Sequence, residues 1–137
     1  MNLPTTEDRD PISIGLSKKS DEDVLSLLLQ RQKDALNATE TAIPEIAKAA
    51  EALQTVTVSG GKIGYAGAGS AGLTALADCL ELPGTFGFPV ERMRMLYAGG
   101  AANLLHLAGT YEDDEEAGFA DFQKSGLGEG DINIGLN

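Results

Sequence analysis

One glycine-rich segment has the residue types and spacing that could hold a ligand. GAGSAG, residues 67–72, follows a short apolar run and matches the GxGxxG pattern of a strand that turns into a helix. Glycines let the backbone approach an anion, and Ser70 can donate its hydroxyl or cap the helix. Such a turn can be a tight connection without a ligand, a sugar-phosphate site or a dinucleotide site.

The dinucleotide alternative has a second requirement that the sequence does not meet. A dinucleotide-binding domain usually places an acidic residue for the ribose hydroxyl at the end of its second strand. The second predicted strand ends in YAGG, residues 97–100, with neither a carboxylate nor an arginine for a ribose phosphate. The sequence therefore favours the other two interpretations of the turn.

Two glutamates are the candidate groups for acid and base catalysis. Glu81 precedes a Pro-Gly pair at a predicted helix end, where a negative charge opposes the helix dipole. A carboxylate placed against local preference is a hint of function. Glu112 begins the run EDDEE, most of which we interpret as a solvated first turn that Thr110 could cap. Only Glu112 is placed to face the same site as Glu81.

The remaining reactive side chains do not form a recognisable site. His106 is the single histidine and lies among leucines, and Cys79 is the single cysteine. No Ser-His-Asp or Cys-His arrangement and no metal-ligand spacing can be argued from them. We therefore expect no metal and no cofactor, a buried Cys79 without a disulfide, and a reducing compartment.

A helical region comes before the glycine-rich segment. Residues 1–20 mix prolines, charges and single apolar residues without a period, which predicts an extended arm. Ser20 can cap an acidic first turn, and the apolar spacing after it predicts a helix over 21–36. Pro44 suits the first turn of a second helix, whose apolar residues keep helical spacing to Val58.

The rest of the chain alternates apolar runs that end in glycine with helical segments. Strands are predicted within KIGYAG (62–67), MRMLYAGG (93–100) and DINIGL (131–136), and helices at about 71–80, 101–109 and 112–124. Pro83-Gly84 should close the first of these helices. The alternation predicts an α/β fold of parallel βαβ units with right-handed crossovers. The third strand would have an open edge, so we expect a second copy or another chain to cover it.

Charge and composition exclude several classes of function. The net charge of −11 would repel a nucleic acid backbone or an anionic membrane as a whole. Residues 1–20 have no apolar core of a signal peptide, and no stretch approaches 18 apolar residues. We therefore expect a cytoplasmic protein that binds neither nucleic acid nor membrane.

The sequence resembles the N-acetylmuramic acid 6-phosphate etherases, whose core is a sugar isomerase (SIS) domain. The resemblance runs through TEDRDP, IPEIAKAAEAL, GGKIGYAGAGSAG, LADCLELPGTFG, YAGG and YEDDEEAG, and so spans nearly the whole chain. It implies an N-terminal half: an arm at 1–20, a helical segment at 21–58, and at 59–137 the first half of a partial three-layer SIS-like domain, with parallel strands flanked by helices.

The resemblance also implies an activity and roles for particular residues. The family's reaction eliminates D-lactate from N-acetylmuramic acid 6-phosphate and adds water, giving N-acetylglucosamine 6-phosphate. Glu81 matches the glutamate proposed to protonate the departing lactate oxygen, and Glu112 matches a second active-site glutamate. The residues that match the first loop around the sugar phosphate are Gly67, Gly69, Ser70 and Gly72. A homodimer is implied as well.

Three positions depart from the family pattern, and they keep a second hypothesis open. Ala71, Leu73 and Ala101 stand where the family usually has serine, arginine and glutamate. The alternative is a non-catalytic sugar-phosphate-binding or regulatory protein. An unbroken helix would also place Glu81 roughly 16 Å from Ser70. Either that helix unwinds near Asp78, or two chains share one site.

Overall fold

The computed structural model describes residues 9–106 and 111–137, and the chain divides into two compact units, Met1–Ala47 and Lys48–Asn137. In the first unit two short 3-10 turns, Pro11–Ser13 and Leu16–Lys18, stand where an extended arm was predicted. Asp10 initiates the first turn, because its carboxylate accepts a 3.0 Å hydrogen bond from the Ile12 N–H. Residues 1–8 of the predicted arm lie outside the described residues.

One helix, α1 (Asp21–Ser59), replaces the two helices that the sequence predicted. Its start is as expected: the Ser20 hydroxyl accepts a 3.2 Å hydrogen bond from the Asp23 N–H and donates a 2.7 Å one to the Asp23 carboxylate. The predicted break at Pro44 is wrong, because Pro44 lies inside the helix. Proline removes one backbone hydrogen bond, and the alanine- and glutamate-rich sequence on either side favours helix strongly enough to continue.

The second unit contains the predicted parallel sheet. Its strands are β1 (Ile63–Gly67), β2 (Met93–Tyr97) and β3 (Ile132–Leu136), in the order β2-β1-β3. Tyr65 of β1 is aligned with Met95 of β2 and with Ile134 of β3. The central strand is therefore the one that ends in the glycine-rich segment.

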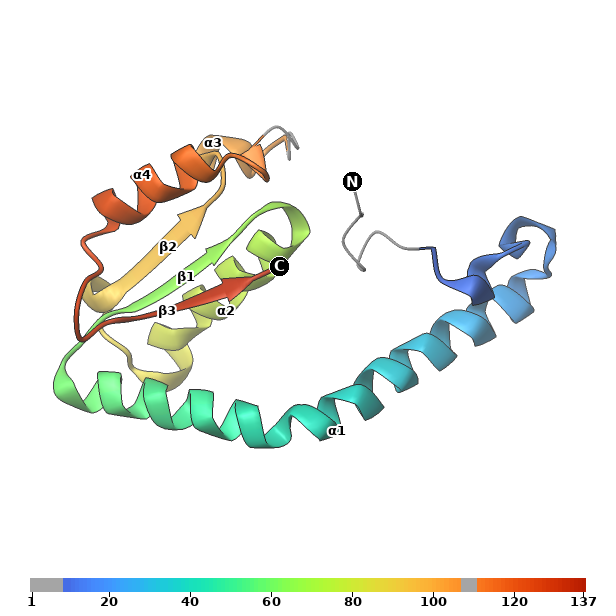
Figure 1. The fold of residues 1–137 in the computed structure, drawn as a ribbon, viewed down its shortest axis with the longest axis horizontal. Coiled ribbons are helices and arrows are strands. Elements are labelled where there is room, and N and C mark those ends of the chain that lie inside the picture. The colour runs from blue at the N-terminus through green and yellow to red at the C-terminus, as the bar shows by residue number, and fades with distance from the viewer. Residues whose placement is uncertain (1–8, 107–110) are drawn as a thin grey trace. The chain divides into compact units, whose positions relative to one another are not determined.

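Helices cover both faces of this sheet, as predicted. The connection from β1 to β2 contains α2 (Gly69–Phe86), and the connection from β2 to β3 contains α3 (Gly100–Asn103) and α4 (Glu115–Ser125). These two connections cross the sheet in opposite directions, so right-handed crossovers place α2 and α4 on opposite faces, as Figure 1 shows. The result is a three-layer α/β arrangement with three parallel strands, consistent with part of a SIS-like domain.

The core lies between the sheet and α2. Its buried members are Ile63, Tyr65, Ala75, Cys79 and Phe88. Cys79 is thus the buried, unpaired cysteine that the sequence predicted. Burial, with a smaller effect of the neighbouring Asp78 charge, raises the pKa of its thiol.

Two helix boundaries differ from the prediction. Helix α2 continues through Pro83 to Phe86 and ends at Gly87, whose φ of 65° is the left-handed conformation typical of a helix C-cap. Helix α4 begins at Glu115, because the Asp114 carboxylate accepts a 2.9 Å hydrogen bond from the Ala117 N–H and caps it. Thr110, the predicted cap, lies outside the described residues.

Helix α3 is shorter than the predicted segment, since only Gly100–Asn103 is α-helical and a turn follows. Residues 107–110 of that segment lie outside the described residues. Across 9–106 and 111–137, no helix combines the length and the apolarity that crossing a membrane requires.

Candidate functional site

The glycine-rich segment forms the turn between β1 and α2. Strand β1 ends at Gly67, Ala68 is the N-cap of α2, and Gly69 has a φ of 51°. Ala68 has no side-chain oxygen that could accept from the first N–H groups of the helix. These donors and the exposed Ser70 hydroxyl lie at the carboxyl end of the central strand, where open α/β sheets bind ligands.

Two of the glycines bring the strand and the helix close together. A Cβ added to Gly67 would lie 2.8 Å from the Gly72 Cα, and a Cβ added to Gly72 would lie 2.8 Å from the Gly67 carbonyl oxygen. The missing side chains therefore allow β1 and α2 to pack tightly. This close packing explains why both positions are glycine, and the explanation does not require a ligand.

Gly69 has a different neighbour, the carboxylate of Glu112. A Cβ on Gly69 would collide with Oε1 of Glu112, so the carboxylate occupies the space that a side chain would fill. Glu112 belongs to the turn before α4 and is exposed. The fold therefore brings this glutamate against the glycine-rich turn, near the positive end of the α2 dipole.

Tyr97 and Asn103 hold the same region in place, and the sequence analysis did not single them out. The Tyr97 hydroxyl donates a 3.1 Å hydrogen bond to the Gly69 carbonyl. The Asn103 side-chain amide donates a 3.0 Å hydrogen bond to the Ala98 carbonyl in the turn after β2. Both residues are buried. A signal was available, because each lies in or next to the YAGG segment at the end of a strand.

Tyr111 packs on the turn after β2, at Gly99. A Cβ built on Gly99 would lie only 2.7 Å from Cδ2 of the Tyr111 ring, so the ring occupies the space beside this glycine. Gly99 has a φ of 78°. Tyr111 is directly followed by Glu112 in the sequence. This ring contact therefore fixes the chain immediately before the glutamate that approaches Gly69.

Glu81 is not brought to this turn within one chain. Because α2 is continuous over Gly69–Phe86, the expectation that it unwinds near Asp78 is wrong. About 16 Å of helix axis separates Ser70 from Glu81. The Glu81 carboxylate accepts a 2.9 Å hydrogen bond from the Thr85 hydroxyl, one turn further along. A single small substrate in one chain does not reach both Glu81 and the α2 N-terminus.

Asp78 has a structural partner in the strand beside it. The buried Tyr65 hydroxyl donates a 2.5 Å hydrogen bond to the Asp78 carboxylate. Burial, together with this hydrogen bond, raises the pKa of Tyr65 far above its ordinary value. The pair ties β1 to the middle of α2 and helps to explain why the helix keeps its regular form there.

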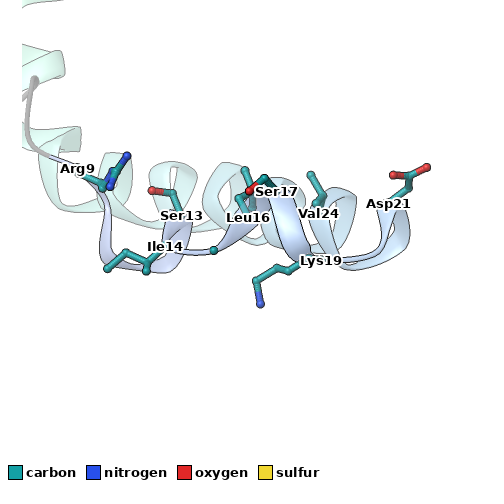
Figure 2. Close-up of a pocket in the computed structure, with 9 residues that line it drawn as sticks. Arg9, Ser13, Ile14, Leu16, Ser17, Lys19, Asp21 and Val24 are labelled. Atoms are coloured by element: carbon teal, nitrogen blue, oxygen red, sulfur yellow. The ribbon is translucent and has the colours of Figure 1, made fainter.

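Two cavities lie elsewhere. One of about 450 Å³ is bounded by β2, α3 and α4 and includes Ala101 in its wall. The other, of about 580 Å³, belongs to the first unit, and Figure 2 shows the charged groups of Arg9, Lys19 and Asp21 there pointing apart from one another. Neither cavity is lined by Ser70 or by the two candidate glutamates.

Metal-ligating side chains do not gather in the described part of the chain. Among residues 9–106 and 111–137, no group of three or more His, Cys, Asp or Glu side chains is arranged to hold an ion. The arrangement at the turn offers N–H donors, one hydroxyl and one carboxylate. Those groups suit a small anionic ligand and a proton transfer.

Comparison with known proteins identifies relatives of the chain. It is 35% identical over 131 residues to an N-acetylmuramic acid 6-phosphate etherase of Pasteurella multocida, covering 96% of this chain and 44% of that protein. A protein of the same name from Erwinia tasmaniensis is 34% identical, with 96% and 43% covered. N-acetylmuramic acid 6-phosphate etherase 1 of Vibrio cholerae is 32% identical, with 96% and 44% covered. No family model matches the chain.

The structure defines the chain as an α/β protein whose three parallel strands flanked by helices are consistent with part of a SIS-like domain. It is a relative of the N-acetylmuramic acid 6-phosphate etherases and matches an N-terminal half of them. The chain spans about 44% of the length of the curated relatives that it matches.

Proposed function

We propose that this chain is a lyase, or part of one, that cleaves the D-lactyl ether of N-acetylmuramic acid 6-phosphate in the cytoplasm. The relatives are N-acetylmuramic acid 6-phosphate etherases, which supports this reaction class. The observation that carries the proposal is the contact of the Glu112 carboxylate with Gly69, because it unites a possible proton-transfer group with the anion-binding end of α2.

The reaction requires both proton removal and proton delivery. A base takes the proton next to the ether carbon, the C–O bond breaks, and an acid protonates the departing oxygen of D-lactate. Water then adds to the unsaturated sugar, and N-acetylglucosamine 6-phosphate is formed. In this proposal Glu81 is the acid and Glu112 is the second carboxylate, while the α2 N-terminus and the Ser70 hydroxyl hold the 6-phosphate. No cofactor or metal takes part.

Glu81 enters this proposal through a second copy of the chain. The continuous α2 helix keeps Glu81 three turns from Ser70 of its own chain. We therefore propose that one active site combines Glu81 of one copy with Ser70 and Glu112 of the other. Such a site would exist only in a homodimer.

A second candidate function is binding of a sugar 6-phosphate without catalysis. Leu73, where the resemblance leads one to expect an arginine, is 39% exposed on α2 and offers no charge to a phosphate. Ala101 likewise places a methyl group in the wall of the 450 Å³ cavity, where a glutamate was expected. Fewer polar groups are then available to act on a substrate.

One experiment separates the two functions. Lactate release from N-acetylmuramic acid 6-phosphate is measured with the wild-type chain, with Glu112→Gln and with Glu116→Gln, which changes an exposed carboxylate of α4. The lyase proposal expects turnover by wild type and Glu116→Gln, and a loss of about 100-fold or more in Glu112→Gln. Wild type that releases no lactate but binds N-acetylglucosamine 6-phosphate in calorimetry would establish the second function instead.

A further inference from the structure

The Tyr97 hydroxyl contacts a carbonyl that already has a backbone partner. Tyr97 is the last residue of β2, is 5% exposed and donates a 3.1 Å hydrogen bond to the Gly69 carbonyl in the first turn of α2. Inside a helix this carbonyl accepts from the N–H group four residues further on, that of Leu73. The hydroxyl is therefore a second donor to Gly69, and a phenylalanine at position 97 would fill the same space without it.

The Tyr97 ring is held in place over the same turn. Tyr97 is aligned with Gly67 of β1, and the next N–H group, that of Ala98, donates a 3.1 Å hydrogen bond to the Gly67 carbonyl. A Cβ built on Gly72 would lie 2.7 Å from Cε2 of the Tyr97 ring. The missing side chain of Gly72 thus leaves room for the ring, and this packing fixes the position of the hydroxyl.

A hydrogen bond to the Gly69 carbonyl also fixes the N–H group of Ser70. The two groups belong to one planar trans peptide unit, so they point in opposite directions. The Ser70 N–H is one of the first N–H groups of α2, which have no carbonyl partner within the helix. A donor on the carbonyl also polarises the peptide unit and strengthens its N–H as a donor. The Tyr97 hydroxyl therefore orients one anion-binding N–H from the opposite side of the peptide unit.

The same hydroxyl closes a ring of contacts that includes Glu112. Gly99, two residues after Tyr97, packs on the Tyr111 ring. Glu112 follows Tyr111 directly, and its carboxylate lies against Gly69. Gly69 is thus held from two sides, at its carbonyl by Tyr97 and at its Cα by Glu112. Loss of the hydroxyl would open this ring at the point where it joins α2.

We propose that Tyr97 is a positioning residue of the candidate site. Its hydroxyl sets the peptide unit between Gly69 and Ser70 so that the Ser70 N–H donates to the phosphate group of the ligand. It also keeps Gly69 where the Glu112 carboxylate meets it. The inference rests on the proposed function, because it takes a sugar 6-phosphate as the ligand of the turn, and it applies to the lyase and to the binding protein alike.

Tyr97→Phe removes the hydroxyl alone, and Tyr65→Phe is the matched control. Tyr65 is 4% exposed, and its hydroxyl also joins a strand to α2, but through Asp78 in the middle of the helix. Each variant loses one buried hydroxyl and one hydrogen bond to α2, so both should unfold at a lower temperature than wild type. Only Tyr97→Phe should change how the chain handles the ligand.

Calorimetry with N-acetylglucosamine 6-phosphate and lactate release from N-acetylmuramic acid 6-phosphate measure the effect. We expect Tyr97→Phe to raise the dissociation constant and the KM about tenfold, because an oriented donor to a charged group is lost. Its kcat should fall as Glu112 moves. In the absence of ligand, the magnetic resonance signal of the Ser70 amide should shift in Tyr97→Phe and stay in place in Tyr65→Phe. Tyr65→Phe should also keep the binding and kinetics of wild type.

The outcomes separate this inference from the proposed reaction. Wild type that binds the sugar phosphate but releases no lactate would end the lyase proposal, and the dissociation constants would still test Tyr97. Equal dissociation constants for wild type and Tyr97→Phe would overturn the inference even where lactate is released. An equal loss in Tyr65→Phe would overturn it as well, because the cause would then be general destabilisation. Wild type without affinity for the sugar phosphate would overturn both.

Discussion

Gly69 carries the closest contact of the candidate site. Its φ of 51° is a backbone conformation that residues other than glycine rarely adopt. Its missing Cβ leaves the space that the Glu112 carboxylate fills. Backbone and contact thus require glycine for two independent reasons. The sequence pattern grouped Gly69 with Gly67 and Gly72, whereas the structure gives Gly69 the Glu112 carboxylate as its nearest neighbour and packs Gly67 and Gly72 against each other.

The stability of Gly69→Ala, compared with that of an alanine variant at an unconstrained glycine, should show whether Gly69 is specifically required. We expect it to lower the free energy of unfolding by about 1–3 kcal/mol through backbone strain, and to displace Glu112. Gly118→Ala, inside α4 with open space at its Cβ, should instead raise stability by about 0.5–1 kcal/mol. Urea denaturation measures both changes. An equal effect in the two variants would show that the Gly69 contact has no special weight.

Asp131 is a second residue whose carboxylate organises backbone. It accepts a 2.7 Å hydrogen bond from the Lys62 N–H and a 2.9 Å one from the Gly128 N–H. These bonds, together with the Lys62 ammonium group 3.5 Å away, favour the charged form and lower the pKa of Asp131. The carboxylate therefore ties the start of β1 to the turn before β3.

The lowered pKa of Asp131 predicts a dependence of stability on pH. Its contribution is complete above the ordinary carboxyl pKa and is lost as the pH falls through the lower folded-state value. Asp131→Asn should be less stable than wild type at pH 7, and the difference should shrink as the solution is acidified below about pH 4. Urea midpoints across this range check the prediction. A gap that is constant with pH would mean that the charge of Asp131 is unimportant.

At the scale of elements, the strands were predictable, but the continuation of two helices through proline was not. Ile63, Tyr65 and Tyr97 lie in short apolar runs that end in glycine, and such runs identify buried parallel strands directly. Pro44 and Pro83 are strong breakers only where the surrounding chain has little helical preference. Both lie in alanine- or leucine-rich helices, which continue past the single lost hydrogen bond.

The approach of Glu112 to Gly69 was only partly predictable. Parallel strands deliver their following loops to one edge of the sheet, which is why Glu112 could be assigned to the same region as the glycine-rich turn. The direct contact depends on Tyr111 and Asn103, which shape the connection after β2 through contacts that no spacing rule predicts. Glu81 illustrates the opposite case, since helix length alone already showed its distance from Ser70.

Arg92 joins the end of α1 to the start of β2, and we expect this link to matter for stability. Its guanidinium donates to the Gly61 carbonyl at 2.8 Å and to the Thr57 carbonyl at 2.9 Å, and it stacks 4.9 Å from the Phe88 ring centroid. These carbonyls lie at and just after the helix C-terminus and lack a continuing helix as partner. Arg92 therefore supplies donors that the backbone cannot.

Arg92→Ala should lower the free energy of unfolding by about 1–3 kcal/mol, since charged donors to these carbonyls are lost. Arg92→Lys should restore only part of that loss, because one ammonium group cannot reproduce the planar fork or its stacking on Phe88. Glu91→Ala, at the neighbouring position, serves as the control and should change little. Denaturation midpoints measure the stability of each variant, and an Arg92→Lys variant as stable as wild type would mean that the planar guanidinium and its stacking on Phe88 contribute little.

For the whole molecule, the two compact units differ in how they are stabilised. The second unit has a buried core between the sheet and α2, whereas residues 9–47 of the first unit include no buried side chain. Helices without a packed face are marginal in water. Burial within residues 9–47 therefore adds little to the stability of the first unit, and the proposed shared active site calls for association of two copies of the chain.

Mixing inactive variants tests the shared site at this scale. Glu81→Gln and Glu112→Gln should each lose about 100-fold or more of lactate release. When the two are co-expressed, half of the dimers combine both variants, and each such dimer regains one complete site, so activity should return to about one quarter of wild type. Co-expression of Glu81→Gln with the Glu81→Gln/Glu112→Gln double variant is the control, because no pairing then contains an intact Glu81. Recovery in neither mixture would mean that Glu81 and Glu112 do not meet across two copies of the chain.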